Sequence, residues 1–237
     1  MAHSVDIYGG LDPREAPVYS VREAAHYLRM PASTLRDWVR GRRYATTDGE
    51  RDWHPIVDRT TALHERLSFL DLVQASVLAS IRREHKVVVP RIRRAISYVK
   101  KELGVERPLL EQTFETDGAS LFVKSFGHLV NASDEGQLAM EQLLRASLQR
   151  IDRDERGIAN RFYPWHVAPT EERRVIVIDP KKLFGRPAVA NTRIPVDVLV
   201  DRNKSGDSER LLAADYEIPL EDVQAAIAWG SRAAAAA

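Results

Sequence analysis

Residues 20–41 contain two short helix patterns separated by a break, and this arrangement restricts the fold more than any other feature of the 237-residue chain. Ser20 followed by Glu23 is a capping box, which marks the start of a helix. Arg29-Met30-Pro31 interrupts the apolar periodicity, and a second helix pattern then runs to Gly41. Two short helices joined by a turn of three or four residues predict a helix-turn-helix. A helical hairpin used only for packing is the alternative.

The second helix pattern presents a basic surface. From Arg29 to Arg43 the sequence has five arginines and one acid, Asp37. Hydroxyl groups at the start of a recognition helix can meet phosphates or base edges, and arginine pairs with guanine or with the DNA backbone. We therefore predict that the DNA-contacting residues are Ser33, Thr34, Arg36, Arg40, Arg42 and Arg43.

The next segment extends this prediction. Residues 44–65 are polar and aromatic, with a turn signal at 46–49, and they predict a β-hairpin wing. Two amphipathic helices are expected to follow, one over 67–83 and one starting near Pro90. Residues 82–101 contain eight Lys or Arg and one acid, so this run could contact flanking phosphates or be a solvated face. The candidate phosphate contacts are Arg82, Arg83, Arg91 and Arg94.

The formal charge of +1 is the sum of two unlike halves. Residues 1–110 have 19 Lys or Arg and 14 Asp or Glu, a net +5, whereas residues 111–237 have 16 and 20, a net −4. Such asymmetry suggests a polyanionic partner for the basic half, although a solvated basic face is common.

Several classes of function are excluded or disfavoured. The absence of cysteine excludes disulfides, thiolate zinc sites and a cysteine nucleophile, and it fits a reducing cytoplasm. No apolar run reaches the length of a membrane span, so we expect no membrane partner. The seven histidines show no metal-ligand spacing, and no phosphate-binding glycine loop or Gly-x-Ser-x-Gly motif occurs. We expect a cytoplasmic protein that is not an enzyme and has no metal or cofactor.

The rest of the chain predicts two further segments. Residues 106–170 read as a small α+β connector and candidate dimer interface, with strands on either side of a turn at Asp117-Gly118 and a helix from Ser133 to about Ile151. Residues 171–230 predict a short strand and three helices that resemble a second helix-turn-helix. The last of these helices starts with acids, which repel phosphates. The predicted class is α+β, mainly α, with residues 17–105 as the DNA-binding domain and tails at 1–16 and 231–237.

Residues 17–105 resemble the MerR-like winged helix-turn-helix. The matching strings are Tyr19-Ser20-Val21-Arg22-Glu23-Ala24-Ala25, Ser33-Thr34-Leu35-Arg36-Asp37-Trp38 and Leu67-Ser68-Phe69-Leu70-Asp71-Leu72. The string from Gly185-Arg186-Pro187 to Thr192-Arg193-Ile194-Pro195 looks like the small antitoxin domain of bacterial type II toxin–antitoxin operons. Asn191 stands where that family usually has Gly, and Asn tolerates a left-handed backbone. Taken together, the chain is similar to a VapB-like antitoxin of the mycobacterial type.

This resemblance implies two partners. The N-terminal domain would bind operator DNA as a homodimer, and the C-terminal half would neutralise a PIN-like ribonuclease toxin, which gives autoregulation of the operon. PIN-like sites use clustered carboxylates with Mg²⁺, so Arg186 or Arg193 would block such a site, and Tyr216 is a third toxin-binding candidate. Hydrogen bonds from these arginines to backbone carbonyls are the alternative. The alternative function is a stand-alone MerR-like transcription factor with a ligand- or protein-sensing C-terminal half.

Overall fold

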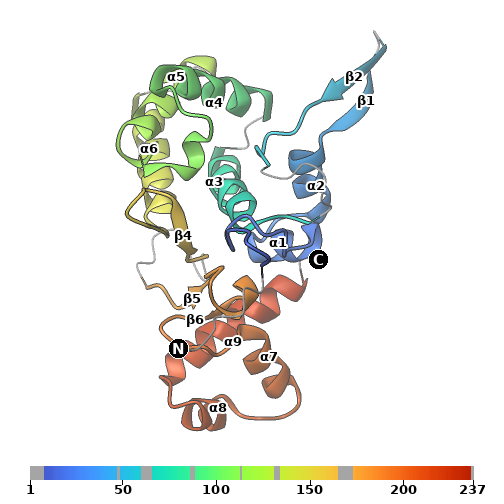
Figure 1. Cartoon of the computed structure of the whole chain (residues 1–237), viewed down its shortest axis with the longest axis vertical. Helices are drawn as coiled ribbons and strands as arrows, with labels where there is room; N and C mark the ends of the chain where they lie inside the picture. The colour runs from blue at the N-terminus through green and yellow to red at the C-terminus, as the bar shows by residue number, and fades with distance from the viewer. Residues whose placement is uncertain are drawn as a thin grey trace.

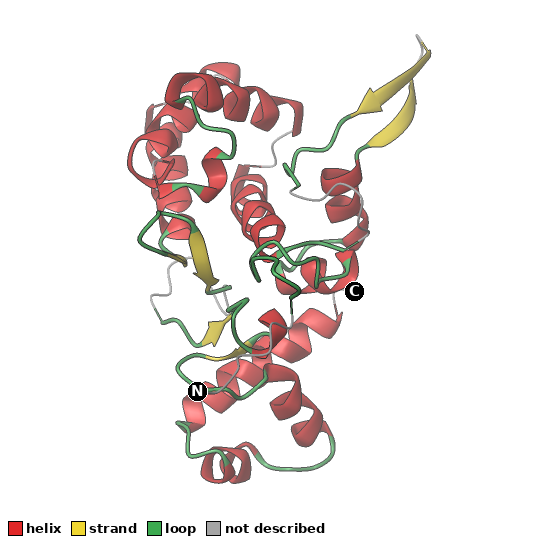
Figure 2. Ribbon diagram, in the orientation of Figure 1, coloured by secondary structure: helices red, strands yellow, loops and turns green. Residues whose placement is uncertain are grey.

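The computed structural model describes residues 8–46, 49–59, 66–85, 89–112, 114–130, 134–164 and 173–235. Helices dominate these residues, and the strands among them form separate two-stranded antiparallel sheets (Figures 1 and 2). The predicted class, α+β and mainly α, is confirmed.

The N-terminal part contains a helix-turn-helix, a β-hairpin and two longer helices. Its elements are α1 (Val21–Tyr27), α2 (Ala32–Arg40), β1 (Arg42–Thr46), β2 (Gly49–Trp53), α3 (Phe69–His85) and α4 (Val89–Leu103). The predicted hairpin is confirmed, with Arg42 opposite Trp53 in the register, whereas its turn residues Thr47 and Asp48 lie outside the described residues. Figure 1 shows the hairpin projecting away from the helical body next to α2.

A capping box starts α3, and a pair of backbone hydrogen bonds just ahead of it joins this helix to the chain before α1. The Ser68 N–H donates to Asp71 Oδ2 at 3.0 Å, and the Asp71 N–H donates to Ser68 Oγ at 3.1 Å. Tyr19 and Leu67 exchange backbone hydrogen bonds of 3.0 and 2.7 Å just ahead of this box. Burial raises the pKa of the Asp71 carboxyl, although its bonds to Ser68 oppose that effect.

The middle part differs from the sequence-based expectation. Its elements are η1 (Pro108–Leu110), the π-helical turn η2 (Phe114–Gly118), α5 (Ala119–Val130), α6 (Asp134–Leu148), β3 (Ile151–Arg153) and β4 (Ala159–Phe162). The hairpin expected around Asp117-Gly118 is wrong, because α5 replaces its second strand. Phe122 and Phe126, four residues apart, are fully buried and stack at 5.8 Å on one face of this helix. Gly118 serves packing, because a Cβ there would lie 2.7 Å from the ring of Phe114.

The C-terminal part consists of a small sheet and three helices. Its elements are β5 (Ile176–Val177), η3 (Leu183–Gly185), β6 (Ala188–Val189), α7 (Val196–Lys204), α8 (Glu209–Asp215) and α9 (Leu220–Ala235). The predicted helix boundaries are confirmed here: Pro195 precedes α7, and Ser208 Oγ accepts a hydrogen bond of 3.2 Å from the Leu211 N–H at the start of α8. The Ser133 cap expected before α6 lies outside the described residues.

Two principal hydrophobic cores stabilise the molecule. The larger one runs from Tyr19 to Ile178 and joins the helix-turn-helix to α3, α4, α5 and α6, while α7, α8 and α9 enclose a second core around Trp229. In Figure 1, α3 lies at the centre, and the C-terminal helices lie at the end opposite the hairpin. Among the described residues, no helix is both long and apolar enough to cross a membrane.

Candidate nucleic-acid interface

The turn between α1 and α2 is held by local hydrogen bonds. Ser20 Oγ accepts from the Glu23 N–H at 3.1 Å and Glu23 Oε2 accepts from the Ser20 N–H at 2.8 Å, which confirms the predicted capping box. Arg29 takes a left-handed conformation with φ 52°, and the Met30 N–H donates to the carbonyl of Ala25 at 3.0 Å. The predicted helix-turn-helix is present, and its turn fixes the direction of α2.

The two faces of α2 differ in chemistry. Its buried side chains are Leu35, Trp38 and Val39, at 0–3% exposure. The opposite face presents the predicted DNA-contacting residues of this helix: Ser33, Arg36 and Arg40 are exposed, and Thr34 is partly exposed. The exposed hydroxyl and guanidinium groups on this face can approach a duplex.

Gly41 turns the chain from α2 into the hairpin. Its φ is 72°, and its N–H donates to the carbonyl of Asp37 at 2.9 Å. A Cβ at this position would lie 2.2 Å from the carbonyl oxygen of Trp53, so β2 approaches too closely for any residue but glycine. The close approach places the base of the hairpin against the end of α2.

The two arginines that follow Gly41 lie on the hairpin and are both exposed. The Arg42 guanidinium lies 4.7 Å from the centre of the Trp53 ring and 3.3 Å from the Asp37 carboxylate. Arg43 pairs with Asp52 across the hairpin at 3.2 Å. These solvent-exposed pairs are weak, and they hold the guanidinium groups in place without burying them.

The basic run of residues 82–101 divides into two kinds of residue. Arg91 and Arg94 are exposed on α4, as expected for phosphate contacts. Arg93 instead donates to the carbonyl of His54, and Lys100 Nζ lies 2.5 Å from Asp58 Oδ2, so these two hold the segment after β2 against α4. The sequence analysis did not separate them, although their spacing of seven residues places them on one helix face.

The other two predicted phosphate contacts on α3 have different outcomes. The guanidinium of Arg82 lies 5.7 Å from the centre of the Trp38 ring, against the buried side of α2. Arg82 therefore packs against the buried side of α2. The side chain of Arg83 lies outside the described residues.

The three toxin-binding candidates lie at separate places in the C-terminal part. Arg186 forms an ion pair with Asp197. Its partner within the chain is therefore a carboxylate and not the backbone carbonyl given as the alternative. Arg193 is exposed and follows a turn at Asn191, whose φ of 62° shows the left-handed backbone expected there. Tyr216 lies below the Arg202 guanidinium at 5.4 Å.

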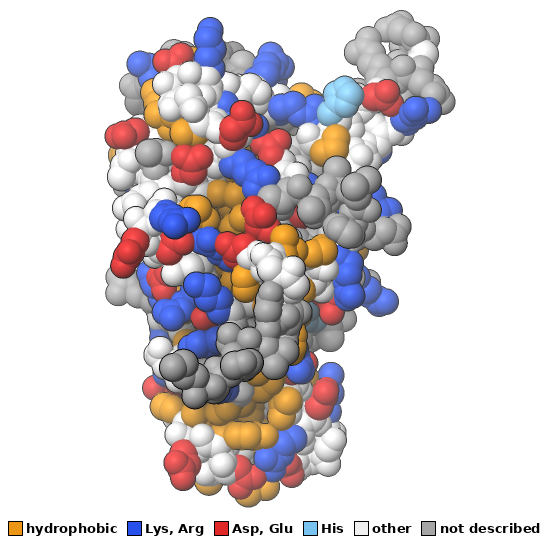
Figure 3. Space-filling view, viewed as in Figure 1, with side chains coloured by type: hydrophobic (Ala, Val, Ile, Leu, Met, Phe, Trp, Pro, Cys, Tyr) orange, Lys and Arg blue, Asp and Glu red, His pale blue; other side chains and the backbone are white. Residues whose placement is uncertain are grey.

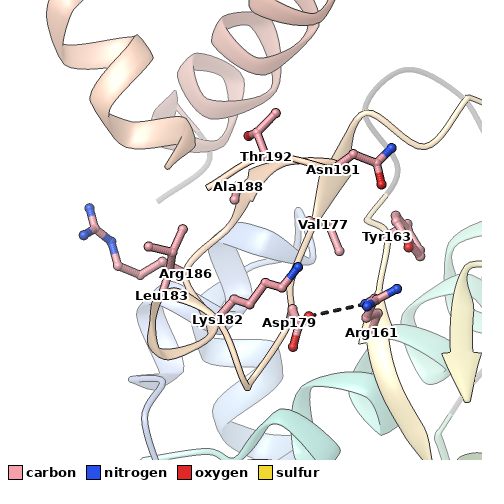
Figure 4. Close-up of a pocket in the computed structure, with 10 residues that line it drawn as sticks. All are labelled: Arg161, Tyr163, Val177, Asp179, Lys182, Leu183, Arg186, Ala188, Asn191 and Thr192. Carbon is pink, nitrogen blue, oxygen red and sulfur yellow. Dashed lines mark hydrogen bonds and ion pairs between the residues drawn. The ribbon is translucent and has the colours of Figure 1, made fainter. Parts of the chain in front are cut away.

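A pocket borders the first of these candidates. Arg161 Nε donates to Asp179 Oδ2 at 3.3 Å in its wall, and Lys182, Asn191 and Thr192 also line it. Figure 4 shows the Lys182 side chain extending over Asp179 toward Arg161, while Arg186 points away from the pocket. No cluster of metal-ligating residues occurs in the part of the chain that the structure describes.

The helix-turn-helix contacts the C-terminal part directly. The Tyr27 ring of α1 stacks on the Trp229 ring of α9 with centroids 5.9 Å apart, and His26 contacts the same indole at 6.3 Å. The Tyr19 hydroxyl donates to the carbonyl of Gly185 at 2.9 Å. The sequence analysis missed these contacts, because residues more than 160 positions apart share no local pattern.

Two family models match parts of the chain. Residues 17–96 match a model described as “Putative DNA-binding HTH domain”, and residues 176–229 match a model described as “Protein of unknown function (DUF433)”. Similar proteins come from Mycobacterium tuberculosis (strain ATCC 25618 / H37Rv). The chain is 25% identical over 230 residues to “Putative antitoxin VapB45”, covering 90% of this chain and 93% of that protein. It is 26% identical over 219 residues to “Uncharacterized protein Rv2308”, covering 89% and 88% respectively.

The crystal structure of Rv2018 from Mycobacterium tuberculosis has a similar fold. Its TM-score is 0.64 at 21% sequence identity, and the alignment covers 90% of this chain and 98% of that one. The matched helix-turn-helix model spans the residues that form α1, α2, the hairpin, α3 and the first half of α4. The chain is thus similar, over nearly its whole length, to “Putative antitoxin VapB45”, and the part that matches the helix-turn-helix model displays the arginines of α2.

Proposed function

We propose that this protein is an antitoxin that binds operator DNA, neutralises a PIN-like ribonuclease toxin and so autoregulates its operon in the cytoplasm. The observation that supports the proposal most strongly is the exposed polar face of α2, which continues onto the hairpin through Arg42 and Arg43. The protein acts by binding in this proposal and has no catalytic role.

In the proposed DNA complex, α2 enters the major groove with Ser33, Arg36 and Arg40 toward the bases and phosphates. The β1–β2 hairpin is the wing of a MerR-like domain and contacts the flanking backbone, while Arg91 and Arg94 approach phosphates from α4. A homodimer would read two half-sites about 34–36 Å apart. The direct contacts from Arg93 and Lys100 to the segment after β2 support this arrangement, because they fix α4 relative to the hairpin.

The proposed toxin contact lies in the acidic C-terminal half. Similarity to “Putative antitoxin VapB45” over 90% of the chain supports an antitoxin role. Arg193 is exposed and Arg186 is half-exposed, so each is accessible to the carboxylates of a PIN-like site. Tyr216 is partly exposed and is the third proposed contact residue.

One experiment tests both partners. The purified chain is titrated with a DNA fragment from upstream of its own gene, and the ribonuclease encoded beside that gene is assayed for RNA cleavage with and without the chain. We expect sequence-specific DNA binding and stoichiometric loss of cleavage. DNA binding without any effect on the nuclease would instead support the stand-alone transcription factor. If the chain neither binds the DNA nor inhibits the nuclease, the proposal is contradicted.

A further inference from the structure

The segment that connects β5 to β6 contains an unusual backbone. Leu183 has φ 50° and Phe184 has φ 54°, so two consecutive residues with bulky side chains adopt the left-handed conformation, and Gly185 follows with φ 73°. L-residues other than glycine rarely enter this region, because the Cβ approaches the following carbonyl oxygen. Two such residues in succession persist only when the surrounding structure holds them there.

Several hydrogen bonds hold this loop. The Gly185 N–H donates to the carbonyl of Lys182 at 2.9 Å, and the Arg186 N–H donates to the carbonyl of Leu183 at 3.0 Å. The buried Tyr19 hydroxyl donates to the Gly185 carbonyl from below at 2.9 Å, and a Cβ on Gly185 would lie 2.1 Å from this hydroxyl oxygen. The loop thus packs directly against Tyr19 of the N-terminal part.

The strained conformation displays an aromatic side chain on the surface. Phe184 is 59% exposed, and its one ring contact among the described residues is Tyr8, with centroids 6.2 Å apart. Burial of a phenylalanine would normally stabilise a fold, but here most of the ring faces solvent, so burial within this chain does not compensate for the strain. Figure 3 shows a group of hydrophobic side chains over the C-terminal elements.

The charges around the exposed ring are mostly positive. Lys181 and Lys182 precede it and are exposed, and Arg186 follows it. The neighbouring carboxylate of Asp179 is 7% exposed and bonded to Arg161, so it adds little negative charge to the surface. A complementary partner therefore offers an apolar cavity with carboxylates at its rim.

We propose that residues 182–186 are the docking loop for the toxin, with Phe184 inserted into an apolar pocket of that protein and carboxylates of the pocket rim paired with the exposed Lys181 and Lys182. This inference rests on the proposed antitoxin function and specifies where the contact lies and what chemistry it requires. Aromatic side chains that enter a pocket at the centre of an interface supply a large share of its binding energy.

A protein partner fits the loop better than DNA does. The loop belongs to the C-terminal half, whose net charge is −4. It also lies beside β5 and β6, away from the hairpin, which projects from the body next to α2 (Figure 1).

The test compares Phe184→Asn with Leu138→Asn in the full-length chain. Leu138 is 58% exposed on α6, so the control removes an equally exposed hydrophobic side chain elsewhere. Asn tolerates a left-handed backbone, so the Phe184 variant should keep or raise the midpoint of thermal unfolding. Affinity for the ribonuclease encoded beside the gene, measured by calorimetry with a catalytically inactive form of that nuclease, should fall about tenfold or more in the Phe184 variant and stay unchanged in the control. Lys182→Glu should weaken binding, and Arg210→Glu on α8 should not.

The outcomes separate the docking loop from the antitoxin function. If the wild-type chain binds the nuclease and Phe184→Asn binds equally well, the docking loop is wrong and the antitoxin function stands. If the wild-type chain does not bind the nuclease, both fail. A lower unfolding midpoint together with weaker binding in Phe184→Asn would assign the residue a structural role and overturn the loop. Reduced operator affinity with unchanged nuclease affinity would overturn it in favour of DNA.

Discussion

The hydroxyl of Tyr19 donates to the carbonyl of Gly185 at 2.9 Å, in a buried contact that joins the chain just before α1 to the loop after β5. Gly185 is the position at which a side chain would collide with this hydroxyl. Tyr27 and Trp229 stack beside it and complete the contact between the two parts. The DNA-binding part and the C-terminal part are therefore packed together through specific aromatic residues.

Tyr19→Phe should destabilise the protein by about 1–2 kcal/mol, because it leaves the buried Gly185 carbonyl without its donor. The free energy of unfolding in urea measures this effect. Tyr98→Phe, at an exposed tyrosine of α4, is the matched control and should change stability by no more than a few tenths of a kcal/mol. Equal stability of the two variants would show that the Tyr19 bond adds nothing to the fold.

Stability should fall at alkaline pH. Burial raises the pKa of the Tyr19 phenol, and burial also raises the pKa of Tyr27 to about 12. In the unfolded chain these phenols ionise near pH 10. Their contribution is thus fully present below about pH 10 and is lost as the pH rises toward the folded-state values, because the unfolded state then releases protons that the folded state retains.

The measurement is the free energy of unfolding from about pH 8 to about pH 11. Tyr27→Phe should flatten the decline relative to the wild type. A wild-type curve that is level above pH 10 would contradict the protonated state of the buried phenols.

Replacing Arg36 and Arg40 with alanine should weaken operator binding. If each contacts one phosphate, the slope of log K against log salt should shrink by about 0.9 per residue. Fluorescence anisotropy over a series of salt concentrations measures the slope. Arg210→Ala, at an exposed arginine of α8, should leave it unchanged, and wild-type affinity in the double variant would reject α2 as the recognition helix.

Arg91 and Arg93, two residues apart on α4, should respond differently to alanine. Arg91→Ala should reduce the salt slope by about 0.9 and leave stability intact, because the side chain is exposed. Arg93→Ala should lower stability, because Arg93 donates to the carbonyls of His54 and Pro55. The pair is compared by urea unfolding and by anisotropy, and the assignment of Arg91 fails if its variant binds DNA with the wild-type slope.

Gly41→Ala should destabilise the junction of α2 and the hairpin by more than about 1 kcal/mol. The added Cβ would lie 2.2 Å from the Trp53 carbonyl oxygen, and a φ of 72° is itself strained for alanine. Gly104→Ala is the control, because its φ is 66° and nothing lies within 4 Å of the added Cβ. The difference between the two variants in thermal unfolding isolates the collision, and equal losses would mean that β2 moves freely away from Gly41.

Much of the local structure follows from sequence patterns. The Ser20–Glu23 capping box, the stop at Gly41 and the start of α7 after Pro195 were all predictable, because each depends on residues within one helical turn. The exposure of Arg36 and Arg40 also followed from the spacing of Leu35, Trp38 and Val39 on the opposite face. These features require no knowledge of distant parts of the chain.

The segment around Asp117-Gly118 shows where such patterns fail. A two-residue turn signal between apolar runs predicted a hairpin, but the apolar side chains also recur at helical spacing in Phe122 and Phe126. Short apolar runs fit both periods. Packing of these rings against each other and against Phe114 favoured the helix.

The sequence by itself determined the helix-turn-helix, the basic face of α2 and the order of elements in the C-terminal part. Only the tertiary structure decided which cations are available to a partner: Arg93 and Lys100 are used to hold the segment after β2, while Arg91 and Arg94 are exposed. It also decided that Tyr19 supports the loop at Gly185. The physical reason is that helix boundaries depend on near neighbours, whereas the partner of a charged or buried polar group depends on which distant segments pack beside it.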